Sequence, residues 1–273
     1  ENLSIRDWEI PFEFSHGAFR FGHAMVRPEY QINDQSLHDL NVTLEKSSLN
    51  DPANMPLDET WMVQWSRFFD IDGSTPNLSR RIGPHLSDGM GNDKIFPAFD
   101  QTERVGLLYR DLLGAGLAGM WSVDALIAGI GNRRPHFVAM SRLLADREYR
   151  VGKLREWLSA EPAYGALTSD DIETLSNDPP LPFFVLFEAM HQANGQHLGL
   201  LGSIIISEVI FGALAANPHA ADAGSLTGQL GGISREFYLA NVLQDIPDIS
   251  SMAQLVEFTT EIADLRQAVP AFL

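Results

Sequence analysis

The chain has 273 residues, enough for a large domain with a substantial buried core, and it is strongly acidic. Asp and Glu total 36 against 19 Lys and Arg, which gives a formal net charge of −17 at pH 7. Such a surface repels phosphate backbones and anionic lipid headgroups, so neither nucleic acid nor a membrane is expected as a partner. The sequence contains no cysteine, which excludes disulfides, thiolate metal ligands and thiol nucleophiles within it.

The first predicted element is a helix that Pro11 can open, because the N–H that proline lacks has no partner in a first helical turn. Pro28 ends this helix, and its apolar positions recur at helical spacing: Phe14, Ala18, Phe21 and Met25. Residues 29–58 are polar and irregular and are expected to form a long loop. A second helix is predicted from the spacing of Trp61, Trp65 and Phe68.

Capping signals mark the helices in the middle of the chain. Asp100 and Glu103 have the spacing of a capping box and predict a third helix with the apolar stripe Val105, Leu108, Tyr109 and Leu112. Ser122 is expected to cap a short helix that stops near Gly129 and Gly131. Residues 149–158 favour a further helix, and residues 168–171 form another capping box.

The last third of the chain is predicted to be helical around one loop. Pro182 opens a helix that Gly195 closes, and the apolar segment 198–216 follows. Because that segment contains Glu208, a buried core helix is favoured over a membrane span. Residues 217–235 are expected to form a loop, and residues 251–254 to cap a final helix with one apolar face: Leu255, Phe258, Ile262 and Leu265. No strand pattern is long, so a single all-α domain over residues 1–273 is predicted.

The first helix carries a basic face that is unusual in so acidic a chain. Its members fall at i, i+4, i+7 and i+11: His16, Arg20, His23 and Arg27. A solvated helix face is the simplest interpretation of such a stripe. The same residue types also suit a binding site, because a neutral imidazole can ligate iron and a guanidinium can pair with a carboxylate.

The sequence of residues 13–26, EFSHGAFRFGHAMV, resembles the proximal helix of the animal-type haem peroxidases. In that family the pattern Ala-[Phe/Tyr]-Arg-[Phe/Tyr]-Gly-His carries the iron ligand. The resemblance implies that His23 is the proximal ligand of haem b iron and that Arg20 pairs with a haem propionate. Gly22 would leave room for the flat macrocycle. Weaker similarities follow in chain order, over residues 77–87, 107–119 and 180–212.

The second similar motif, residues 107–113, departs from the family at Asp111. The family usually has an asparagine there, which accepts a hydrogen bond from the proximal histidine. A carboxylate in that role would hold the imidazole N–H more strongly, push electron density towards iron and assist catalysis. The alternative is a solvent-facing aspartate beside Arg110. Gly114 stands where the family has a basic residue, so one propionate contact is expected to be absent.

The resemblance implies a mainly helical haem peroxidase, incomplete on the distal side, that uses hydrogen peroxide to oxidise a small-molecule reductant. It also favours a secreted or extracytoplasmic location. The family's distal histidine and arginine lie well before the proximal helix, whereas only 22 residues precede His23 here. We therefore expect a missing N-terminal segment or a second chain to supply those two distal residues, which perform the acid–base chemistry, together with any calcium site.

Two alternatives stay open. Fatty-acid dioxygenases of the same superfamily place a radical-forming tyrosine three residues before the proximal histidine, where this chain has Arg20. That residue favours the peroxidase branch. The chain could instead be a catalytically silent helical module, with or without haem, although the presence of both His23 and Arg20 argues against this.

Overall fold

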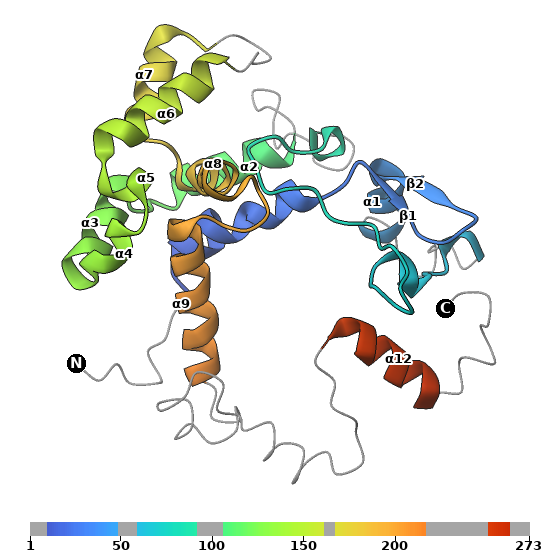
Figure 1. Cartoon of the computed structure of the whole chain (residues 1–273). Coiled ribbons are helices and arrows are strands. Elements are labelled where there is room, and N and C mark those ends of the chain that lie inside the picture. The colour runs from blue at the N-terminus through green and yellow to red at the C-terminus, as the bar shows by residue number, and fades with distance from the viewer. Residues whose placement is uncertain (1–9, 49–58, 92–105, 161–166, 217–250, 263–273) are drawn as a thin grey trace. The chain divides into compact units, whose positions relative to one another are not determined.

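A computed structural model describes residues 10–48, 59–91, 106–160, 167–216 and 251–262. This described part is mainly helical, with one small two-stranded sheet (Figure 1), which confirms the predicted all-α class. The chain divides into two compact units, each described separately below. The first unit comprises residues 1–26 and 80–211, and the second comprises residues 27–79 and 212–273.

The first unit is built from short and medium helices. In chain order these are the π-helix η2 (Glu13–Gly17), the 3₁₀ helices η3 (Ala18–Met25) and η7 (Asp88–Gly91), and the α-helices α2 (Leu107–Leu117), α3 (Val123–Arg133), α4 (Pro135–Ala139), α5 (Arg142–Ala145), α6 (Arg147–Ala160), α7 (Ser169–Asn177), α8 (Leu181–Ala193) and α9 (Leu200–Ala216).

Helix α8 forms the centre of the hydrophobic core. Four of its apolar residues are at most 1% exposed: Phe184, Val185, Phe187 and Ala189. Leu154 of α6 and Leu201 of α9 pack into the same core. Full burial of one such side chain stabilises the fold by about 1.5–3 kcal/mol, so α8 is the main source of stability in this unit.

Glycines let neighbouring segments approach α8 closely. A Cβ at Gly17, where η2 meets η3, would lie 2.6 Å from Leu181 Cδ2. A Cβ at Gly202 of α9 would lie 2.9 Å from Val185 Cγ1. Any larger residue at either position would push the two segments apart.

Several predicted helix boundaries are confirmed. Ser122 Oγ accepts a hydrogen bond from the Ala125 N–H and caps α3, and residues 168–171 form a capping box at α7. Helix α8 ends at Asn194 and Gly195, both with positive φ. Helix α3 contains both glycines and ends at Arg133, so the predicted stop near Gly129 and Gly131 is confirmed. Core packing by this helix outweighs the glycine penalty of about 1 kcal/mol per residue.

The apolar helix α9 buries one face, through Leu201, Ile205 and Val209, while Ile210 and Phe211 are about half exposed. The predicted core helix is thus confirmed for that face. Within the described residues, no helix combines the length and apolar character that crossing a membrane requires.

The second unit contains a small hairpin that the sequence analysis did not predict. Strands β1 (Glu29–Gln31) and β2 (Leu37–Asp39) pair antiparallel, with Tyr30 opposite His38, and α1 (Leu40–Ser48) follows directly. The unit also contains η5 (Glu59–Trp61), η6 (Trp65–Arg67) and α12 (Met252–Ile262). The prediction of a loop over residues 29–58 is therefore wrong for residues 29–31 and 37–48.

The helix predicted from Trp61, Trp65 and Phe68 is also wrong, since only the short turns η5 and η6 form there. Asn33 Nδ2 donates to the carbonyls of Glu59 and Met62. These bonds use carbonyl oxygens that a regular helix would need for its own ladder.

At the end of the described chain, Ser251 and Gln254 cap α12 reciprocally, as predicted: the Ser251 hydroxyl accepts from the Gln254 N–H, and the Gln254 side chain accepts from the Ser251 N–H. The predicted cap at residues 100–103, the loop at 217–235 and Leu265 lie outside the described residues.

Candidate functional site

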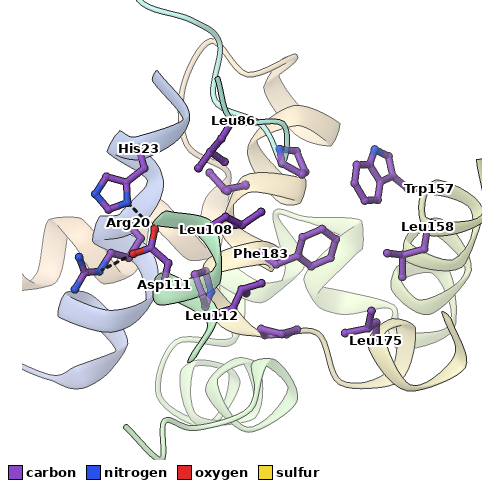
Figure 2. A pocket seen from close by; sticks show the side chains of 14 residues that line it. Arg20, His23, Leu86, Leu108, Asp111, Leu112, Trp157, Leu158, Leu175 and Phe183 are labelled. Carbon is purple, nitrogen blue, oxygen red and sulfur yellow. Dashed lines mark hydrogen bonds and ion pairs between the residues drawn. The ribbon is translucent and has the colours of Figure 1, made fainter. Parts of the chain in front are cut away.

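Asp111, near the middle of α2, lies at the centre of the candidate site. Its side chain is 8% exposed, and one carboxylate oxygen, Oδ2, lies 2.6 Å from His23 Nδ1 (Figure 2). The other oxygen, Oδ1, lies 3.8 Å from Arg20 Nε. The contact expected from the sequence, across 88 positions, is therefore present. The alternative of a solvent-facing aspartate is excluded.

Arg20 and His23 reach the same carboxylate because they lie three residues apart in η3, a 3₁₀ helix in which side chains at that spacing are in line. A regular α-helix would also bring this pair together, and a continuous one would align His16 and Arg27 with it, as the predicted four-residue basic face required. Because η3 spans only Ala18–Met25, just Arg20 and His23 of that face share it.

The other two members of the predicted basic face have separate contacts. His16 lies in η2, where Nδ1 is 3.0 Å from Ser15 Oγ and the ring packs edge-on against Phe12. Arg27 follows the end of η3 and donates to the Leu78 carbonyl within the second unit. The prediction of one shared face for all four residues is wrong.

The bond to Asp111 fixes which nitrogen of His23 is free. A carboxylate can only accept, so Nδ1 carries a proton, and in the neutral imidazole Nε2 is then the nitrogen with the lone pair. Figure 2 shows the second ring nitrogen pointing away from Asp111. The side chain is 29% exposed, and a Cβ at the neighbouring Gly22 would meet nothing within 4 Å. This orientation, with open space beside it, suits a histidine that ligates a metal in a flat macrocycle.

Arg20 is only loosely paired. Its side chain is 37% exposed, and the 3.8 Å separation from Asp111 exceeds hydrogen-bond length. Among the described residues Arg20 makes no hydrogen bond, so its donors can serve a second anion such as a propionate. Gly114 has no side chain to offer the site. A Cβ at this position would lie 3.7 Å from His16 Cδ2.

An apolar cavity of about 220 Å³ adjoins Asp111. Its walls come from α2, α6, α7 and α8 and include Leu112, Trp157, Leu175 and Phe183 (Figure 2). The sequence analysis did not predict this cavity, because its walls are ordinary apolar residues on four helices and no local pattern distinguishes them from the core.

A second buried carboxylate, Glu188 of α8, was also missed. It is 0% exposed and accepts hydrogen bonds from the backbone N–H groups of Leu201 (2.9 Å) and Gly202 (3.2 Å), in the first turn of α9. Burial raises the pKa of Glu188 to about 7, although these two hydrogen bonds oppose the rise. Gly199 makes room for it, since a Cβ there would lie 2.2 Å from Glu188 Cγ. Glu188 thus ties α9 to α8.

No cluster of three or more histidine, aspartate or glutamate side chains suited to a metal ion occurs in the part of the chain that the structure describes. Comparison with protein-family models, with curated proteins and with solved structures finds no significant match to this chain. The motif around His23 and the geometry of Arg20, His23 and Asp111 are therefore the features that point to a function.

Proposed function

We propose that this chain binds haem b through His23 Nε2 and forms the proximal side of a haem peroxidase. The observation that carries the proposal is the 2.6 Å contact between His23 Nδ1 and Asp111 Oδ2. Metal-ligating histidines almost always donate their other ring N–H to such a partner. A buried carboxylate is among the strongest of these partners, because the hydrogen bond is charge-assisted.

Each residue of the group would have a distinct task. His23 would hold the iron, Asp111 would fix the ring and increase the electron density on Nε2, and the exposed guanidinium of Arg20 would hold a propionate. Haem, when bound, would supply a redox-active iron for cleavage of the peroxide O–O bond and oxidation of a small-molecule reductant.

The proton transfer that peroxide cleavage needs would come from elsewhere. General acid–base help contributes roughly 10²–10⁴-fold to such steps. We propose that a distal histidine and arginine on another segment or on a second chain provide it. Haem-loaded chain alone should then turn over peroxide slowly, and activity should rise when that polypeptide is added. Native mass spectrometry of the active species from its natural source should reveal it, and fast turnover by a single 30.2 kDa chain would contradict this part of the proposal.

The ligand is tested by haem titration of the purified chain, followed by its Soret absorption. His23→Ala should abolish the axial-histidine spectrum and weaken haem binding by at least tenfold. His16→Ala is the matched control, because His16 lies on the same helical segment without contacting Asp111, and it should behave as wild type. An unchanged iron spectrum in His23→Ala would refute the proposal, and a normal spectrum without activity in the complete assembly would favour a silent haem module.

A further inference from the structure

The cavity beside Asp111 is a pocket that opens to the surface and has apolar walls. This cavity measures about 220 Å³ and is lined almost wholly by apolar side chains. An engineered leucine-lined cavity of about 150 Å³ stays dry and binds benzene, so this one has room for a slightly larger molecule.

The cavity has one polar end, where Asp111 meets Arg20 and His23. Oδ2 of Asp111 is occupied by His23, but Oδ1 has only the loose pair with Arg20 at 3.8 Å. Among the described residues no hydrogen-bond donor reaches Oδ1, although a carboxylate oxygen can accept two bonds. Leu108, which also lines the cavity, is 42% exposed, so a molecule can enter from the surface beside α2.

We infer that this cavity binds a small, neutral aromatic molecule that carries one N–H or O–H donor. The donor would bond to Asp111 Oδ1, and the ring would lie among Leu112, Trp157 and Phe183 (Figure 2). A charged ligand, whether an anion or an amine, would lose its hydration between the apolar walls, so a neutral molecule is favoured. The site goes beyond the proposed haem function and does not depend on it, because its ligand would bond to Asp111 Oδ1 and pack on the apolar walls without contacting His23 Nε2.

Three bicyclic probes of nearly equal shape test the inference on the haem-free chain by ligand-observed NMR. Indole has an N–H donor, indene has neither donor nor acceptor, and benzofuran has only an acceptor. Indole should bind at least fivefold more tightly than indene, because a hydrogen bond to a charged group is among the stronger ones, and benzofuran should bind most weakly. Asp111→Leu should remove the preference for indole while indene still binds.

Filling the cavity gives an independent test. Leu175→Phe and Leu112→Phe should each weaken indole binding by at least tenfold. Leu117→Phe is the matched control, since Leu117 lies on the same helix as Leu112 but is 79% exposed and does not line the cavity. Its binding should equal that of wild type. If a filled variant fails to fold, the order of the three probes on wild type decides the question.

The inference is overturned if wild type shows no saturable binding of indole, if benzofuran binds as tightly as indole, or if both filled variants fold and still bind indole normally. Because these titrations use protein without haem, their failure leaves the haem proposal standing. Failure of the His23→Ala haem test likewise leaves the probe results unaffected.

Discussion

Two buried carboxylates of the first unit, Asp111 and Glu188, solve the problem of a charge in the interior in different ways. Asp111 is 8% exposed and faces the side chains of His23 and Arg20. Glu188 is fully buried and accepts from backbone N–H groups at the start of α9 and, at 3.4 Å, from the side-chain amide of Gln192. Asp111 can therefore orient two side chains that are part-exposed, whereas Glu188 holds the first turn of α9 against α8. The comparison makes Asp111 the carboxylate of the candidate site and Glu188 a link between two helices.

The largest effect should come from removing Glu188. Glu188→Ala would leave a cavity and two N–H groups of α9 without acceptors, and should lower the free energy of unfolding by about 2–4 kcal/mol. Urea unfolding followed by circular dichroism measures this. Glu208→Ala is the control, because Glu208 lies at an exposed position of α9, the helix that Glu188 of α8 binds. This variant should change stability by less than about 0.5 kcal/mol. Equal effects of the two variants would remove the structural role assigned to Glu188.

The same residue should make stability depend on pH. Burial raises the pKa of Glu188 from 4.5 to about 7, so the folded state binds this proton more tightly than the unfolded state. The contribution of Glu188 to the free energy of unfolding is therefore fully present below pH 4.5 and falls, by about 3 kcal/mol, as the pH rises through 7.

This loss of stability with rising pH arises from Glu188 only if it is absent in Glu188→Gln. Urea unfolding of wild type and variant at several pH values between 4 and 8 gives the difference between them. Asp124, whose pKa is lowered by hydrogen bonds and charge pairing with Arg147 and Arg150 despite the opposing effect of burial, contributes with the opposite sign. Because Asp124 is present in both proteins, it cancels in the difference. Parallel pH curves would show that Glu188 titrates as in the unfolded chain.

Asp111 should affect the haem far more than the fold. Loss of such a partner typically costs 10–100-fold in metal affinity, so Asp111→Ala should weaken haem binding by roughly that factor. Asp111→Asn keeps an acceptor but removes the charge, so it should retain more haem and raise the iron midpoint potential. Spectroelectrochemistry measures the potential. A potential unchanged in Asp111→Asn would mean that the carboxylate does not act on His23 electronically.

Local signals and the family motif predicted much of this first unit. The caps at Ser122 and Thr168 follow from short-range hydrogen bonding and needed no tertiary information. The contact between His23 and Asp111 is long-range and was expected only because both residues match a known pattern. In the second unit the cap of α12 was predicted from local signals, but the short turns η5 and η6, whose carbonyls accept from Asn33, stand where periodicity had predicted a helix.

Features that depend on how helices meet were not predictable. The burial of Glu188 requires Gly199 beside it and the first turn of α9 in front of it, and neither is visible from the sequence around Glu188. The break between η2 and η3, which leaves only Arg20 and His23 of the basic stripe on one segment, is equally hidden, since the spacing fits one continuous α-helix. The apolar cavity is the volume left between four helices, which no single segment encodes.

The smallest effect, and the sharpest test of the comparison, concerns Arg20, which could serve Asp111 or a bound propionate. As a partner of Asp111 alone it forms a loose, partly exposed ion pair, and such pairs contribute about 0–1 kcal/mol. Arg20→Ala should then change the affinity for haem and for haem dimethyl ester equally. If Arg20 instead holds a propionate, the variant should lose several-fold in affinity for haem but nothing for the ester, whose propionates carry no charge. We expect the second result, because the guanidinium is 37% exposed and makes no hydrogen bond among the described residues. Arg27→Ala, from the same predicted stripe, is the control and should bind both forms as wild type does. Equal losses for haem and ester in Arg20→Ala would assign the arginine to Asp111 and remove it from the proposed cofactor site.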